Sequence, residues 1–222
     1  WGLLLAVAEI LVLLAMVVLI VWMSDAERRI PIQYAKRVVG RKMYGGQSTH
    51  IPLKVNQAGV IPVIFAMSFL QFPLTITYFM SADSATAMWI TKWLSPSGSP
   101  GVWVYAIFNV MLIMFFTYFY TAIQFNPVEM ANNLRKNGGA IPGIRPGKPT
   151  TDFISKILSR ITLLGALFLS AIAILPIIVG NVGKINISLG GTSVLIMVGV
   201  ALDTVRNLES QMMMRHYKGF LD

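Results

Sequence analysis

The segment "PGKPT" (146–150) is the part of this chain that comes closest to a nucleotide-binding or catalytic motif. It resembles the end of a GxxxxGK[ST] phosphate loop, in which the lysine contacts phosphate and the Ser or Thr contacts magnesium. Here Lys148 is followed by Pro149, position 142 is proline where the motif has glycine, and no buried strand is expected before the loop. These differences argue against a nucleotide site.

Metal binding and acid–base catalysis also lack the side chains that they need. The chain has no cysteine, and its two histidines, His50 and His216, have no second imidazole or paired carboxylate nearby in sequence. No HExxH or GxSxG motif occurs, and Ser68 has no base in its apolar segment. We therefore expect no enzyme activity, no metal and no cofactor.

The composition is that of a membrane protein. Of the 222 residues, 55% are apolar and 12% are charged, and the mean hydropathy is +0.68. A hydrocarbon core about 30 Å thick requires about 20 apolar residues per helix. The sequence therefore predicts an all-α, polytopic transmembrane helix bundle with five spans, at about residues 1–23, 56–80, 101–125, 157–180 and 187–202.

The basic residues are distributed very unevenly between the connections. Seven lie in loop 24–54 and six between residues 126 and 160, whereas linkers 81–100 and 181–186 hold one each. Lys and Arg are enriched on the cytoplasmic side of membrane proteins. We expect the cation-rich loops and the tail 203–222 to be cytoplasmic. The chain then begins outside a cell membrane, which suggests that it is a segment of a longer polypeptide.

Both cytoplasmic loops carry signals of ordered structure. "RIPIQY" (29–34) alternates in the manner of a strand, and "HIPLKV" (50–55) can return beside it, which predicts a hairpin-like arm. "NPVEMANNLRKNGG" (126–139) predicts a short helix that Asn126 caps and that Asn137-Gly138 ends.

The second loop, 126–156, also contains the glycine- and proline-rich segment "GAIPGIRPGKPT" (139–150). Its prolines fix φ, while Gly143 and Gly147 allow sharp reversals of the backbone. The composition predicts a stiff platform that presents Arg145 to the cytoplasm.

Three long segments resemble one family, SecY, the central subunit of the protein-conducting channel. They are "YAKRVVGRKMYGGQSTHIPLKVNQAGVIPVIFA" (34–66), "FNPVEMANNLRKNGGAIPGIRPGKPT" (125–150) and "GGTSVLIMVGVALDT" (190–204). They occur in the family's order and at its spacing, and the five spans match its C-terminal half, in the bacterial or chloroplast form. The resemblance implies that an N-terminal half completes the channel.

The resemblance assigns roles to five residues of the spans. It places Ile64 and Ile196 in an apolar pore constriction, where branched side chains can exclude water and ions. It makes span 56–80 one wall of a lateral gate, with polar positions at Asn56, Gln57 and Ser68. Without the resemblance, the two isoleucines are ordinary apolar residues, and the polar ones are ordinary interhelical contacts.

Pro62 is a further expected feature of the gate wall. Because proline removes one backbone hydrogen bond, we expect it to bend span 56–80.

The resemblance also identifies partners. The cytoplasmic loops are expected to dock a ribosome, through its rRNA, or the SecA ATPase motor, and SecE and SecG are expected as companion subunits. The driven channel would pass unfolded secretory polypeptides across the bilayer and membrane segments laterally into it. Anionic lipids are an alternative partner of the same cations. The expected docking residues are Arg145, Lys148, Lys36, Arg41 and Lys42.

A different class of function also fits part of the pattern. Gly190-Gly191 and Pro62 can be interpreted as helix interruptions, so the chain could be half of a secondary transporter with broken helices. Such transporters couple to ions through charges in their spans, and Glu9 is the one candidate. A carboxylate near the centre of a helix costs about 3 kcal/mol on insertion scales. The simpler reading places Glu9 near the membrane edge of a helix that starts upstream.

Overall fold

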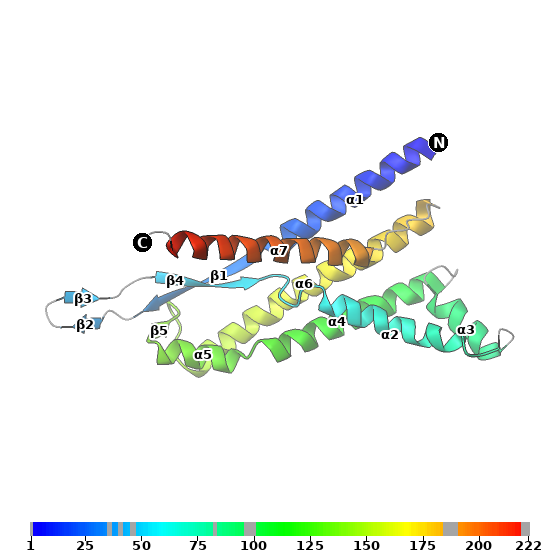
Figure 1. The fold of residues 1–222 in the computed structure, drawn as a ribbon. Coiled ribbons are helices and arrows are strands. Elements are labelled where there is room, and N and C mark those ends of the chain that lie inside the picture. Colours follow the sequence, from blue (N-terminus) through cyan, green and yellow to red (C-terminus); the bar gives the residue numbers. More distant parts are fainter. Residues whose placement is uncertain are drawn as a thin grey trace.

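The computed structural model describes the backbone of the chain at residues 2–34, 37–39, 42–44, 48–81, 84–95, 101–183 and 191–218. The fold is mostly helical, with strands confined to the segments between helices (Figure 1). The helices are α1 (Gly2–Asp25), α2 (Ile61–Thr77), α3 (Ala85–Leu94), α4 (Gly101–Gln124), α5 (Pro127–Lys136), α6 (Lys148–Gly183) and α7 (Gly191–Lys218). The strands are β1 (Glu27–Tyr34), β2 (Arg37–Val39), β3 (Lys42–Tyr44), β4 (Ser48–Lys54) and β5 (Gly139–Ala140).

The long helices share one hydrophobic core. It takes side chains from α1, α2, α4, α6 and α7, so that elements far apart in sequence are held together. The buried members are Met16, Ile20, Val63, Ala66, Ile113, Phe168, Leu169, Ile172, Ala173, Val194, Leu195 and Val198. The same helices also bury a few polar side chains, Asn109 and Thr117 of α4 and Ser170 of α6.

A second core lies at the end of the molecule that carries the sheet and α5 (Figure 1). β1 pairs antiparallel with β4, from Glu27 opposite Lys54 to Gln33 opposite Ser48, and β5 pairs with the other edge of β1. One face of β1 is closed by α5 and the first half of α6. The buried members are Ile30, Ile32, Leu53, Ala131, Leu134, Ile141, Ile154, Leu158 and Ile161.

This second core gives the segments between the spans a folded structure of their own. "RIPIQY" lies within β1, and "HIPLKV" lies mostly within β4, so both predicted strands are present. The arm itself stays a prediction, because residues at its turns, such as Gly40 and Gly45, lie outside the described part of the chain.

Three stretches of the described chain are long and apolar enough to cross a membrane: Val7–Asp25, Gly101–Lys136 and Lys148–Val179. α2 is apolar but has only 17 residues. α7 passes from an apolar first half into a second half with Asp203, Arg206 and Glu209. The prediction of an apolar helical protein is thus confirmed, while the number of five spans stays a prediction.

We expected Pro62 to bend a helix, and this prediction was wrong. The chain turns at residues 55–60, and α2 begins only at Ile61. Pro62 therefore lies in the first helical turn, where its missing N–H would have had no partner within the helix. The proline inside α2 is Pro73.

α6 begins earlier than the hydropathy of the sequence suggested. Residues 148–156 were assigned to a loop, but they are already helical. Pro149 fits the first turn, and the backbone N–H groups of Thr150 and Thr151 both donate to the Gly147 carbonyl oxygen at 3.1 Å. A helix starts where its first donors find acceptors, and hydropathy does not report this.

Candidate functional site

α2 has two faces of different character. Val63, Ala66 and Leu70 are buried in the main core. Ile64 lies off this face and its side chain is 41% exposed. The Ser68 hydroxyl donates to the Ile64 carbonyl oxygen at 2.8 Å, which satisfies Ser68 within its own helix. α2 thus offers an apolar face that the described chain leaves uncovered.

The seam between α2 and α4 is aromatic. Phe65 and Phe69 of α2 both approach Phe116 of α4, with ring centroids 5.7 and 6.2 Å apart. These separations lie in the range where aromatic pairs attract one another beyond their buried area. The two helices are therefore joined by contacts that need no hydrogen bonds.

Asn109 is a polar residue at this seam that sequence analysis did not single out. It lies on α4 and is fully buried. Its Nδ2 donates to the Met67 sulfur at 3.6 Å, and the Tyr105 hydroxyl donates to the same sulfur at 3.4 Å. Its Oδ1 has no hydrogen-bond partner among the described residues. Asn109 could have been identified from the sequence, because an Asn inside an apolar span is expected to face other protein side chains.

On α7, Ile196 is half-buried and lies beside Leu195, which is fully buried. Neither Ile196 nor Ile64 belongs to the buried core of the described residues. α7 passes close to the start of α2, since a Cβ added at Gly199 would lie 3.1 Å from Cγ1 of Val60. The two predicted pore residues thus lie on helices that approach each other at this point.

Asn56 and Gln57 precede α2 and are not part of it. They lie in the turn 55–60, where Gly59 has φ +63°. Both are half-buried, and both side-chain oxygens are buried without a hydrogen-bond partner among the described residues. The two amides line a cavity of about 200 Å³ between the ends of α1 and β4, the start of α2 and the middle of α7.

The platform at residues 139–150 is an ordered turn. Gly143 and Gly147 have φ values of +82° and +112°, conformations that favour glycine. The Thr150 hydroxyl donates to the Arg145 carbonyl oxygen at 2.9 Å, and Ile144 packs on the second core. The side chains of Arg145 and Lys148 are exposed. The backbone of this loop is thus fixed while its two cations are exposed.

The other three predicted docking residues lie wholly or partly outside the described part of the chain. Lys36 and Arg41 lie outside the described residues, and of Lys42 only the backbone, in β3, is described.

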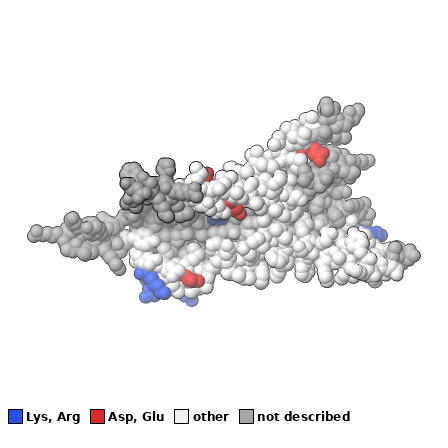
Figure 2. All heavy atoms as spheres, viewed as in Figure 1, with Lys and Arg blue, Asp and Glu red and all other residues white. Residues whose placement is uncertain are grey.

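Basic side chains gather at the end of the molecule that carries α5. The helix predicted at 126–139 is α5, whose Asn126 cap accepts from the N–H groups of Val128 and Glu129 at 3.1 and 3.4 Å. It ends in Arg135 and Lys136, and Figure 2 shows Lys and Arg gathered at this end. α2 and α4 contain no charged residue, and the face over them is uncharged in the same view.

The chain has close relatives among known proteins. A family model described as SecY matches residues 2–205. A protein translocase subunit SecY from Streptomyces galbus is 50% identical over 210 residues, which are 94% of this chain and 47% of the relative. The corresponding subunit from Mycobacterium leprae is 51% identical over an alignment 224 residues long, which covers 96% of this chain and 50% of the relative. The chain spans about half the length of these curated relatives.

Solved structures show the same fold. One solved structure concerns the SecY plug domain, the closed state of the translocation channel and its membrane seal. The match covers 93% of this chain and 50% of that chain, with a TM-score of 0.61 at 20% identity. A structure described as a protein-conducting channel matches 93% and 49%, with a TM-score of 0.61 at 19% identity. At such identities the likeness concerns the fold. The fold and the match over residues 2–205 together show that this chain belongs to the SecY family.

Proposed function

We propose that this chain forms the C-terminal half of a protein-conducting channel. The observation that carries the proposal is the uncovered face of α2. A helix whose one side is buried in the main core exposes Ile64, Phe65, Phe69, Phe72 and Ile76 on the other. Since the chain spans about half the length of its translocase relatives, a further half of the channel is the natural cover for part of this face.

The proposed pore constriction contains Ile64 and Ile196. Both lie outside the buried core, and both are branched and apolar. A narrow throat lined by such side chains loses its water, so ions meet a barrier without any charged filter. Side chains that are not locked in a core can move aside when a polypeptide passes. The remaining members of the ring would come from the N-terminal half.

The proposed lateral gate opens along α2. Its polar positions have different roles. The Ser68 hydroxyl donates its hydrogen bond within α2, so α2 can move away from a neighbouring helix without breaking that bond. Asn56 and Gln57 precede the helix, and their side-chain oxygens find no hydrogen-bond partner in the part of the chain that the structure describes. We propose that these two amides form the hinge from which α2 moves, with the aromatic seam keeping α4 beside it.

The proposed docking surface consists of Arg145 and Lys148, assisted by Lys36, Arg41 and Lys42. It would receive a ribosome, through rRNA phosphates, or the SecA motor. An arginine fork binds phosphate or carboxylate in two-point contacts, so it suits both partners. Anionic lipid headgroups are the competing partner of these cations. The fixed turn that exposes Arg145 favours the ribosome or SecA over lipid, because mobile lipid headgroups need no fixed geometry in the protein.

The assembly that follows is a complex in the cell membrane. Five spans, at about the boundaries given above, would place residue 1 outside and loops 24–54 and 126–156 with the tail 203–222 in the cytoplasm. SecE and SecG would complete it, and the transported molecule would be an unfolded secretory polypeptide. The secondary-transporter alternative finds no support in the relatives, which are named as subunits of a protein translocase.

Reconstitution tests this function directly. The chain, joined to its N-terminal half and combined with SecE and SecG in vesicles, should protect a secretory precursor from added protease when SecA and ATP are supplied. Vesicles without ATP are the control. A precursor that stays fully accessible to protease, in vesicles where the complex is correctly inserted, would contradict the proposal.

A further inference from the structure

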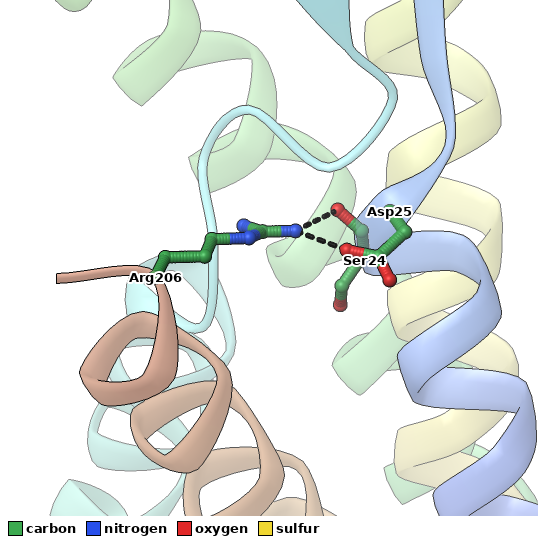
Figure 3. A network of polar contacts seen from close by, with 3 residues as sticks. All are labelled: Ser24, Asp25 and Arg206. Atoms are coloured by element: carbon green, nitrogen blue, oxygen red, sulfur yellow. Dashed lines mark hydrogen bonds and ion pairs between the residues drawn. The ribbon is translucent and has the colours of Figure 1, made fainter. Parts of the chain in front are cut away.

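Arg206 joins the last helix of the chain to the first. Its Nη2 donates to the Ser24 carbonyl oxygen at 3.2 Å and forms an ion pair with the Asp25 carboxylate (Figure 3). Ser24 and Asp25 are the last residues of α1. The final carbonyls of a helix lack donors within the helix, and a cation is favourable there. Arg206 therefore holds the cytoplasmic end of α1 against α7.

The same arginine lines the cavity that contains Asn56 and Gln57. The side-chain oxygens of these two amides are buried, and neither accepts a hydrogen bond from the described residues. A buried acceptor without a donor costs the full free energy of its lost hydration. A donor that reached them would therefore stabilise the arrangement that brought it there.

Apart from the NH2 groups of the two amides themselves, three side chains that line the cavity could donate: Ser24, Lys54 and Arg206. Ser24 has a single hydroxyl, and the ammonium of Lys54 is a strongly hydrated point charge on an exposed residue. Arg206 is different, because its side chain is only 33% exposed and its described contacts use one of its three guanidinium nitrogens. A planar fork can serve two acceptors at once.

A partner for Arg206 is also present on the cavity side. Asp203 lines the cavity and lies three residues before Arg206 on α7, a spacing that places two helical side chains next to each other. Arg206 thus has one acidic partner in Asp25 and a possible second one, Asp203, that lines the cavity. In this structure Arg206 forms its ion pair with Asp25. If the guanidinium turned into the cavity, it would pair with Asp203 instead.

We propose that Arg206 is a positioning residue with two alternative positions. In the closed channel it binds Asp25 and the end of α1. In the open channel it turns toward Asp203 and donates to the amides of Asn56 and Gln57, so that the start of α2 is held by α7. Ile64 lies in the first turns of α2, so this exchange would move a pore residue. The inference rests on the proposed function.

Two substitutions should shift the channel in opposite directions. Asp25→Asn removes the partner of the closed position, so the open probability evoked by a fixed concentration of secretory signal peptide should rise. Asp203→Asn removes the partner of the open position, so it should fall. Each change should be about twofold to fivefold, the factor that a partly exposed ion pair supports. The measurement is single-channel recording of the full complex in planar bilayers.

Two further variants separate this exchange from a purely structural contact. In an Arg206→Gln background, neither Asp25→Asn nor Asp203→Asn should change the open probability further. Glu129→Gln neutralises an exposed carboxylate on α5 that does not line the cavity; it is the matched control and should have no effect. Thermal unfolding of each purified complex identifies any variant that is misfolded.

The outcomes are distinct. Shifts of Asp25→Asn and Asp203→Asn in the same direction, no shift with Asp203→Asn, or effects that persist without Arg206 would each overturn the exchange. If the wild-type complex itself does not open with signal peptide, the proposed function fails, whatever the role of Arg206.

Discussion

The Thr150 hydroxyl donates to the Arg145 carbonyl oxygen at 2.9 Å, which ties the exposed arginine of the platform to the first turn of α6. Thr150 is itself buried. The platform is therefore positioned by the same helix that continues into the apolar bundle. A partner that pushes on the loop would push on α6.

Reversal of the charge at Arg145 tests the docking role. Arg145→Glu should block translocation of a secretory precursor while the complex still assembles, because an exposed side chain contributes to binding and not to the core. Lys92→Glu, the same change on α3, is the control and should leave translocation intact. Normal transport by the Arg145→Glu complex would remove this residue from the docking surface.

Loss of the Thr150 hydroxyl should weaken the platform without changing its charge. Thr150→Val keeps the shape of the side chain but leaves the Arg145 carbonyl without this donor, and should reduce the free energy of unfolding by about 1 kcal/mol. Translocation should fall partially, because Arg145 is then held less firmly. Thr151→Val, which loses a longer bond of 3.4 Å, should have a smaller effect on both measurements. Equal unfolding midpoints for the Thr150 variant and wild type would show that the bond does not matter.

The second core should be open to destabilisation by a substitution that leaves the apolar helix bundle in the membrane. Ile154 is completely buried between the sheet, α5 and α6. Ile154→Ala should destabilise this region by about 2–5 kcal/mol and make loop 24–54 more sensitive to protease, with the complex still in the membrane. Val128→Ala, at an exposed position on α5, is the control. If the Ile154→Ala complex resisted protease as well as the Val128→Ala complex and wild type do, the second core would not hold loop 24–54 in place.

Gly165 should tolerate no larger side chain. A Cβ there would lie 2.6 Å from the Val55 carbonyl oxygen, so α6 and the turn before α2 would have to separate. Gly165→Ala should cost about 1–3 kcal/mol in the free energy of unfolding, the usual range for overpacking. Leu164→Ala, at the neighbouring exposed position, should change it far less. A Gly165→Ala complex as stable as wild type would mean that α6 does not approach Val55 so closely.

Local signals in the sequence predicted local structure well. The side-chain cap of Asn126 and the alternation of "RIPIQY" both correspond to elements of the structure, because each depends on neighbours within a few residues. Hydropathy did not indicate where the helices α2 and α6 begin, because it reports the solvent around a segment and not where its first hydrogen bonds form. The position of Pro62 could have indicated the start of α2.

Tertiary relationships could not be predicted in the same way. Arg206 and Asp25 are 181 positions apart, and no local pattern connects them. The cavity beside Asn56 and Gln57 arises only when α1, α2 and α7 come together. Ile64 was assigned through the resemblance alone, since its neighbours are equally apolar. Its exposure on α2 fits a pore position, and its role there stays a prediction.

A change of polarity at the proposed constriction should make the resting channel leak. Ile64→Ser or Ile64→Gly should raise the ion conductance of the full complex without signal peptide, because a wetter or wider throat no longer excludes ions. Ile107→Ser, on the exposed face of α4, is the matched control. Recordings of the Ile64 variants that equal those of wild type would refute the assignment of the constriction.

Photo-crosslinking during transport tests the central claim most directly. A photoreactive residue at Ile64 or Ile196 of the full complex should crosslink to a secretory precursor arrested in mid-translocation, whereas the same residue at Ile107 should crosslink to lipid. If positions 64 and 196 reacted only with lipid, or no more with the precursor than position 107 does, this chain would not form the wall of a polypeptide channel.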